Sequence, residues 1–225
     1  MRSLQNRVFV CGADRSLTDS VQQFRYDLFV KNLGWSLKSI HGREVDEFDN
    51  ETAVYSVLLD DNRVIACFRA IRTTNEYLAT NIFPQLATVR EYPRRHDIWE
   101  ISRFGVLSSN HYFQIAKLTY GLMLKFAFER RAKALVAVTD VAHERNLGRH
   151  GIRTRRYGPP FEFNVQTDKP PTRLVAGEIP LDAQSRLPLA RLIDLTDTVE
   201  IDDQTLVHGH TRVSTGSSRV AGSAR

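Results

Sequence analysis

Residues 98–139 read IWEISRFGVLSSNHYFQIAKLTYGLMLKFAFERRAKALVAVT, and this stretch decides the fold. An apolar, strand-like run over 98–106 is followed by apolar residues at helical spacing from about Tyr112 to Arg131. A second short apolar run, 134–139, follows that helix. Strands that alternate with helices favour a sheet with helices packed on its faces. The stretch therefore predicts an α/β fold, built as a mixed sheet covered by helices.

Upstream of this unit the pattern predicts a helix, a loop and a hairpin. Val21, Phe24 and Leu28 recur at helical spacing. A polar, acid-rich segment follows, and then two apolar runs separated by Asp-Asp-Asn-Arg, which is a hairpin signal. The expected elements are a helix over 18–33 capped by Thr18, a loop over 34–50, strands over 53–59 and 64–70, and a short helix over 81–86.

Downstream, Asp140 can cap a helix that runs to about His150, with Gly151 as its stop. Further strands are expected over 152–157, 161–165 and 173–179. A doubly wound nucleotide-binding fold is disfavoured, because no glycine-rich phosphate motif follows a strand. We expect one domain over 1–182, then a C-terminal helix and a flexible tail rich in Ser, Gly and Arg over 183–225.

Composition excludes several classes of protein. The chain has 225 residues, 42% hydrophobic and 25% charged, which is typical of a soluble domain. The net charge is +5, but the three arginines of 211–225 carry +3 of it, so a nucleic-acid-binding domain is not expected. No apolar run is long enough for membrane insertion, and no secretory signal is apparent. Both cysteines lie in strand-like runs without metal-ligand spacing, so we expect a reduced, cytoplasmic chain. We also expect a monomer.

Charged and aromatic residues gather in the loop after the first helix. Arg25 and Phe29 share a helix edge, Trp35 follows, and Asp46 and Asp49 flank an aromatic residue. Carboxylates, an arginine and aromatic faces together suit a cationic or zwitterionic ligand. The alternative is a packed pair of aromatics beside a solvated acidic loop.

Two strands carry charges in apolar surroundings. Arg69 lies in VIACFRA, and Glu100 and Arg103 lie in WEISRF. A buried charge needs a partner, so these residues indicate either a site, a structural ion pair, or an edge-strand arginine that faces water. The odd separation of Glu100 and Arg103 places them on opposite faces of a regular strand, so a shared role requires a β-bulge or a strand splay between them.

The three clusters resemble the signature of one family. The stretch FRYDLFVKNLGWSLKSIHGREVDEFD, residues 24–49, is similar to that of the acyl-homoserine-lactone synthases, which make quorum-sensing autoinducers. CFRAIRTTNEYLATNIFPQL and WEISRFGV resemble the next two blocks of that family, and VTDVAHERNLGRHG continues the likeness. Asn32 departs from the pattern, because the family usually has a basic residue there. The resemblance covers roughly residues 5–180.

The resemblance implies a fold and a reaction. The fold is like that of the GNAT N-acyltransferases, a three-layer sandwich whose central strands splay apart. The reaction joins S-adenosylmethionine (SAM) to a fatty acyl group delivered on acyl carrier protein or coenzyme A. Its products are an N-acyl homoserine lactone, methylthioadenosine and the freed carrier. No metal or other cofactor is expected, since SAM is a substrate.

The resemblance also implies roles for individual residues. Glu100 is the candidate base that takes a proton from the SAM amine, and Asp46, Asp49 and Arg69 join it in the catalytic group. The SAM pocket is expected to be formed by Arg25, Phe29, Trp35, Asp46 and Arg103. By this account the three arginines interlock with Asp46, Asp49 and Glu100.

The acyl chain and its carrier are assigned to the second half of the chain. The acyl slot is expected between the long helix and the central strands, lined by Leu122, Met123, Phe126, Val138 and Thr139, although residues at helical spacing are more often plain core than the lining of a tunnel. The carrier is expected to dock on Arg145, Arg149 and Arg153, near Arg155 and Arg156; a solvated basic face is the alternative. The nearest rival functions are a GNAT acetyltransferase and a non-catalytic module that binds SAM or an acyl carrier.

Overall fold

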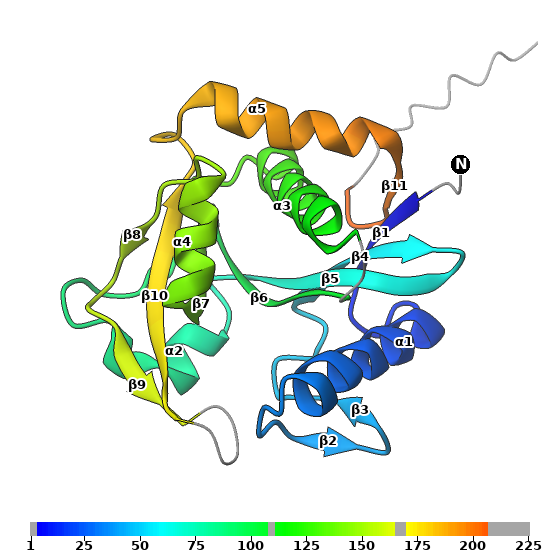
Figure 1. Cartoon of the computed structure of the whole chain (residues 1–225), viewed down its shortest axis with the longest axis horizontal. Helices are drawn as coiled ribbons and strands as arrows, with labels where there is room; N and C mark the ends of the chain where they lie inside the picture. Colours follow the sequence, from blue (N-terminus) through cyan, green and yellow to red (C-terminus); the bar gives the residue numbers. More distant parts are fainter. Residues whose placement is uncertain (1–3, 108–110, 165–169, 207–225) are drawn as a thin grey trace, which may run out of the picture.

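A computed structural model describes residues 4–107, 111–164 and 170–206 (Figure 1). Strands β6 (Ile98–Val106) and β7 (Ala134–Asp140) flank helix α3 (Tyr112–Glu129), as the sequence predicts. In the described part of the chain they belong to a nine-stranded mixed sheet with the order β11-β1-β4-β5-β6-β7-β10-β8, and β9 pairs with β10. The α/β fold class is therefore confirmed.

The other elements follow in chain order. They are β1 (Leu4–Val10), α1 (Arg15–Arg25), a π-helix (Tyr26–Asn32), β2 (Ser39–Ile40), β3 (Arg43–Glu44), β4 (Ala53–Asp60), β5 (Arg63–Arg72), α2 (Leu78–Ile82), a 3-10 turn (Pro84–Leu86), α4 (Val141–Arg149), β8 (Arg155–Arg156), β9 (Phe161–Phe163), β10 (Thr172–Pro180), α5 (Arg186–Asp194), a second 3-10 turn (Leu195–Thr198) and β11 (Val199–Asp203). Strands β2 and β3 form a separate small hairpin.

Helices cover both faces of the sheet. Helix α1 and the β2–β3 hairpin lie on one side of β4 and β5, and α3 and α5 lie on the other (Figure 1). The core on the α1 side includes Phe24, Phe29 and Tyr55. The larger core on the α3 side includes Phe68 and Phe126. The sheet is thus the middle of three layers.

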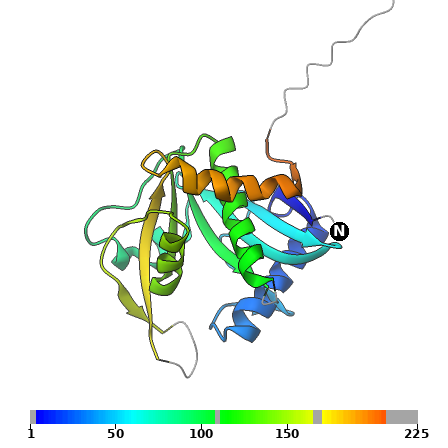
Figure 2. The same cartoon turned by 45° about the horizontal axis from the view of Figure 1, so that its top comes forward.

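Helix α5 crosses α3 at close range (Figure 2). A Cβ atom placed on Gly121 would come within 2.1 Å of the Leu192 carbonyl oxygen. Glycine is therefore required at this crossing, because any larger residue would push α5 away from the core.

The two central strands separate partway along their length. Strands β6 and β7 run parallel and pair only where Ile98–Glu100 meets Ala134–Val136. Both strands continue beyond these pairs, β6 to Val106 and β7 to Asp140. The splay expected from the family resemblance is confirmed, and it opens directly after Glu100.

The structure corrects several local predictions. Helix α1 begins at Arg15, and its cap is Asp14, which accepts from the Leu17 amide at 2.9 Å, rather than Thr18. The Thr18 hydroxyl instead accepts from the Gly12 amide. The predicted helix continues as a π-helix, and the predicted loop over 34–50 contains the β2–β3 hairpin.

The β4–β5 turn has the geometry that its sequence favours. Asp61 and Asn62 both have positive φ, 48° and 65°, as a tight two-residue hairpin loop requires. Asp and Asn tolerate this region better than most residues do. The predicted hairpin is therefore confirmed in both its strands and its turn.

Strand β11, at one edge of the sheet, was not predicted, and its neighbour β1 was anticipated only as the strand-like run around Cys11. Strand β11 pairs in parallel with β1, from Leu4 opposite Val199 to Val8 opposite Asp203. The chain after residue 182 thus adds a helix and a strand to the layers described above. Residue 165 of the predicted 161–165 strand and residues 207–225 of the predicted tail lie outside the described residues. Among the helices that the structure describes, none is both long and apolar enough to cross a membrane.

Candidate active site

A β-bulge brings the charged residues of β6 onto one face. Cys67 pairs with Gly105, and Arg69 pairs with Ser102, so β6 has one more residue than β5 between these pairs. Within the bulge Arg103 has a φ of 53°, a conformation that costs about 1–2 kcal/mol for a residue with a side chain. The bulge on which a shared role depended is present, and it turns Arg103 toward the α1 side.

Arg25 is the first of three arginines on this face. Its side chain has no exposed surface. Nε donates to Glu44 Oε2 at 2.5 Å, and Nη1 donates to Tyr55 Oη at 2.6 Å. Both terminal nitrogens donate to the Asp49 carboxylate, at 2.8 and 3.0 Å. This paired geometry ties the end of α1 to the loop before β4.

Arg69 and Arg103 complete the network. Arg69 donates to both oxygens of Asp46, at 2.5 and 3.0 Å, and to Asp49 at 2.6 Å. Its Nε donates to Ser102 Oγ at 3.1 Å. Arg103 donates to Glu44 at 2.8 Å and to Asp46 at 2.7 Å. We call the six residues that share these bonds the arginine–carboxylate network: Arg25, Arg69, Arg103, Glu44, Asp46 and Asp49.

Three positive and three negative charges balance in the network. Burial opposes ionisation of Asp49, yet the Arg25 and Arg69 guanidiniums hold its pKa well below the usual range. Burial likewise opposes the charge on Arg69, and the Asp46 and Asp49 carboxylates outweigh it and raise its pKa. The charges are therefore retained because each is paired. Only Asp46 and Arg103 have appreciable exposed side-chain surface, 11% and 9%, so they form the open side of the network.

Glu44 occupies the place that was expected for Glu100. Glu44 belongs to the charged loop and to the family-like stretch 24–49, but it was not among the residues predicted for the catalytic group or the SAM pocket. The need of a buried arginine for a second carboxylate would have pointed to it. Glu44 contacts both Arg25 and Arg103. The expectation that Glu100 interlocks with the arginines is wrong in this detail.

Glu100 instead faces the start of α2. Its carboxylate accepts from the amides of Leu78 at 2.9 Å and Ala79 at 2.7 Å. It pairs across the strands with Ile71, two residues from Arg69, and so lies on the face of the network. Burial raises the pKa of Glu100 to about 7, while the two amides and the more distant arginines oppose that rise. A carboxyl group with this pKa is suited to proton transfer near neutral pH.

The aromatic residues predicted for the pocket lie together beside the network. Phe29 and Trp35 stack with ring centroids 5.0 Å apart and an interplanar angle of 15°. Phe29 is buried, whereas Trp35 keeps part of its surface exposed. The Arg69 guanidinium lies 5.6 Å from the centre of the buried Phe48 ring. The structure thus brings the residues of the expected SAM pocket together.

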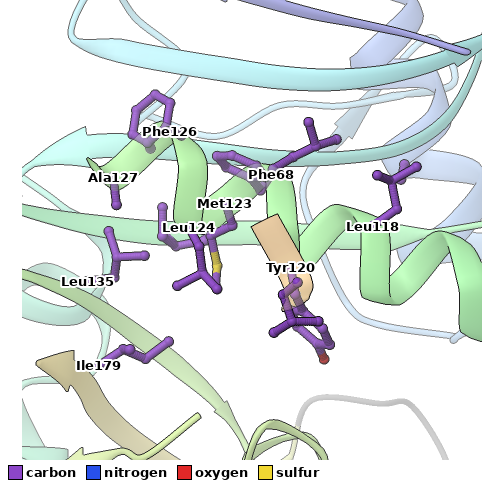
Figure 3. Close-up of a cluster of buried hydrophobic side chains, with 14 of the residues drawn as sticks. Phe68, Leu118, Tyr120, Met123, Leu124, Phe126, Ala127, Leu135 and Ile179 are labelled. Atoms are coloured by element: carbon purple, nitrogen blue, oxygen red, sulfur yellow. The ribbon is translucent and has the colours of Figure 1, made fainter. Parts of the chain in front are cut away.

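The residues predicted for the acyl slot divide between the two faces. Leu122, Met123 and Phe126 are buried in the α3-side core, where Figure 3 shows Phe126 beside Phe68 and Met123. Thr139 shares that face, because it alternates with Val138 along β7. Val138 packs on the opposite side, against the cores that contain Val136 and Phe48. Val138 therefore does not share the space of the other four.

The basic residues predicted to dock a carrier lie on and after α4. Arg145, Arg149 and Arg153 are all exposed. Two of them, Arg145 and Arg153, line an open cavity of about 600 Å³ between α4 and the start of α5. Arg155 and Arg156 are instead paired, with Glu178 and Glu144 respectively. The described residues contain no group of three or more His, Cys, Asp or Glu side chains that could hold a metal ion.

Comparison with known proteins identifies the relatives of this chain. The autoinducer synthase family model matches residues 12–185. The acyl-homoserine-lactone synthase of Acinetobacter nosocomialis is 34% identical over 158 residues, which are 66% of this chain and 86% of that protein.

Solved structures agree with this match. The crystal structure of TofI in a ternary complex with an inhibitor and MTA has a TM-score of 0.70 and 29% identity, covering 85% of this chain and 99% of TofI. The CoA-dependent acyl-homoserine lactone synthase BjaI shares the fold, with a TM-score of 0.76 at 23% identity over 91% of this chain and 96% of BjaI. The arginine–carboxylate network and the splayed sheet thus lie within the region matched by the family model, and the chain belongs to the autoinducer synthase family.

Proposed function

We propose that this chain transfers an acyl group from a thioester to the amine of SAM and then closes the homoserine lactone. The observation that carries the proposal is the buried arginine–carboxylate network beside Glu100, at the point where β6 and β7 part. Membership of the autoinducer synthase family and the likeness to TofI, solved with MTA, support it.

The network positions the nucleophile. Asp46 and Arg103 form its open side, so a SAM carboxylate has a guanidinium within reach and a SAM cation has a carboxylate. The face of Trp35 suits the sulfonium or the adenine. Asp49 and Arg69 have no exposed side-chain surface and act by holding the loop in place.

Glu100 serves as the base. The SAM amine must lose a proton before its lone pair attacks the thioester carbonyl carbon, and Glu100 takes that proton directly or through one water. Because β6 and β7 separate after Glu100, backbone groups of these strands have no strand partner across the gap. Backbone N–H groups there suit the oxyanion of the tetrahedral intermediate. Collapse of that intermediate breaks the C–S bond and frees the carrier thiol.

Lactone closure follows on the acylated product. The methionine carboxylate oxygen attacks its own γ-carbon, and the bond from that carbon to the sulfonium sulfur breaks to release methylthioadenosine. The sulfonium is already a good leaving group, so the protein needs only to hold the folded geometry.

The acyl chain lies on the α3 side of the sheet. Leu122, Met123 and Phe126 lie together in the core on this side. Thr139 faces the same side by strand alternation, and its hydroxyl suits a 3-oxo group. Val138 is left out of this slot because it packs on the other face.

Mass spectrometry of organic extracts from cells that express the chain tests the proposal. Ions of an N-acyl homoserine lactone that are absent from the empty-vector control are expected, and their masses give the acyl group. A purified, folded chain that releases neither lactone nor methylthioadenosine from SAM with any acyl thioester would contradict it.

Trp35→Ala is expected to raise the KM for SAM up to about tenfold, with little effect on kcat, because the variant loses an aromatic face. The measurement is initial rate against SAM at a saturating acyl donor. Leu37→Ala, which removes a partly buried apolar neighbour in the same core, is the control. An unchanged KM in Trp35→Ala would show that the indole serves only the core.

Charge reversal on α4 is expected to weaken docking of an acidic carrier protein. Arg145→Glu and Arg149→Glu should each raise the KM for acyl carrier protein several-fold in low salt, and the effect should shrink as salt is added. Arg191→Glu on α5 is a matched control on another helix. The same KM as wild type at low salt would place the docking surface elsewhere.

A further inference from the structure

A partly buried polar cluster bridges the open ends of β6 and β7. Tyr120 on α3 has its hydroxyl oxygen 3.2 Å from His143 Nε2, and Asn146 Nδ2 donates to the same oxygen at 3.2 Å. His143 and Asn146 both lie on α4, which directly follows β7. We call Tyr120, His143 and Asn146 the tyrosine–histidine cluster.

The cluster also reaches β6. The Phe104 ring stacks on Tyr120, with centroids 4.9 Å apart and an interplanar angle of 18°, and meets His143 edge-on at 5.5 Å. Phe104 lies beyond Glu100, the last residue of β6 that pairs with β7. The cluster therefore spans both sides of the splay, on the face opposite Glu100.

Among the hydrogen bonds between described residues, the bonds within the cluster leave at least one donor of the Tyr120–His143 pair unused. If Tyr120 donates to His143 Nε2, the neutral imidazole carries its hydrogen on Nδ1 and that N–H is unspent. If His143 Nε2 donates instead, the Tyr120 oxygen accepts from both neighbours and its own O–H is unspent. Asn146 donates in both cases. Burial lowers the pKa of His143, so the neutral form that this count assumes is the relevant one at neutral pH.

The cluster is partly exposed. Tyr120 is buried, but His143, Asn146 and Phe104 each keep part of their surface exposed. In Figure 3 the hydroxyl oxygen of Tyr120 points away from Phe68 and Phe126, toward the edge of the apolar cluster. A ligand that enters the splay from its open end thus meets a polar group among aromatic rings.

The position of the cluster matches one part of an acyl donor. Phe104 lies four residues from Glu100, which is roughly 13 Å along a regular strand and somewhat less across the bulge. In a pantetheine thioester the two amides of the arm follow the thioester within roughly the same distance, by ordinary bond lengths. The outer side of α4 carries the exposed Arg145 and Arg149, so a carrier docked there would pass its arm beside α4 to the splay.

We propose that the tyrosine–histidine cluster donates a hydrogen bond to an amide carbonyl of the pantetheine arm and so positions the thioester for attack. This inference rests on the proposed function. The arm is common to acyl carrier protein and acyl-coenzyme A, and the cluster recognises the amide that they share. Tyr120 and His143 are positioning residues, since they act on the arm and not on the reacting atoms.

Truncated donors test the proposal. Rates are measured at saturating SAM with one acyl group on two thiols: N-acetylcysteamine, which keeps an amide, and butanethiol, which has none. For wild type, kcat/KM should be higher with the amide donor. The double variant Tyr120→Phe/His143→Leu should lower kcat/KM about 3- to 10-fold for the amide donor and leave the butanethiol ester unchanged. The two donors are compared on the same protein sample, so any unfolded fraction cancels in their ratio.

His150→Leu is the matched control, because His150 directly follows α4 and its ring lies 5.6 Å from that of Tyr120. It should leave the ratio of kcat/KM for the amide donor to kcat/KM for the butanethiol ester unchanged. The double variant should lower kcat/KM for both acyl-coenzyme A and acyl carrier protein. The donor with the higher kcat/KM in the wild-type protein identifies the carrier that supplies the pantetheine arm. Equal losses for the amide donor and the butanethiol ester, or no loss for either, would overturn the proposal. Absence of lactone from wild type with every donor would instead contradict the proposed function.

Discussion

Glu100→Gln should lower kcat for acyl transfer by about 100- to 10,000-fold, the usual contribution of a positioned base. The amide has nearly the same shape but cannot accept the proton from the SAM amine. The measurement is release of the carrier thiol under single-turnover conditions. Circular dichroism and thermal unfolding should show that the variant is folded, and KM for SAM should change little. Wild-type rates in a folded Glu100→Gln protein would remove Glu100 from this role.

The pH dependence of the same reaction gives a second view of Glu100. Burial raises its pKa to about 7, so the wild-type rate should increase as the pH rises through 7 and the carboxylate forms. The substrate amine also titrates, near its ordinary value of about 8. Glu100→Gln should keep the step due to the amine and lose the one near 7. A wild-type profile with no step near 7 would contradict the assignment.

Asp49→Asn should destabilise the fold by about 3–5 kcal/mol at neutral pH, because it leaves two buried arginines short of a partner. Asp49 accepts from Arg25, Arg69 and the Tyr55 hydroxyl, and its side chain has no exposed surface. The measurement is urea unfolding followed by circular dichroism. Asp27→Asn removes the same charge from an exposed pair with Lys31 and should change the free energy of unfolding little.

The stability that Asp49 contributes has a defined pH range. The pKa of Asp49 in the folded protein is below its ordinary value, which is about 3.9 in an unfolded chain. Its contribution is thus complete above about pH 4 and is lost as the pH falls toward the folded-state pKa. The difference in the free energy of unfolding between wild type and Asp49→Asn should therefore become smaller below about pH 4. An equal difference at pH 7 and at pH 3 would show that the charge of Asp49 is not the cause.

Local pattern was enough to predict most of the fold. The apolar runs at 98–106 and 134–139 and the helical spacing between them appear as β6, β7 and α3. Strand β11 was not predicted, because its sequence VEIDD is mostly acidic and only pairing with β1 makes it a strand. Such long-range pairing has no local sequence signal.

The site was predictable in its residue types but not in its pairing. Buried arginines demand carboxylates, and the loop after α1 supplies three. Which carboxylate meets which arginine depends on the bulge at Arg103 and on where α2 begins. Because of those features, Glu44 pairs with Arg25 and Arg103, and Glu100 accepts from the amides at the start of α2. Val138 and Leu122 lie on opposite faces of the sheet because side chains alternate along β7, so that Thr139 faces α3 and Val138 faces away from it.

A crystal structure of the chain with bound SAM would test the central claim most directly. We expect the SAM amine to lie within about 3 Å of the Glu100 carboxylate, or one bridging water away, with the sulfonium beside Trp35 and the ligand against Asp46 and Arg103. SAM bound away from the arginine–carboxylate network, with its amine remote from Glu100, would contradict the account.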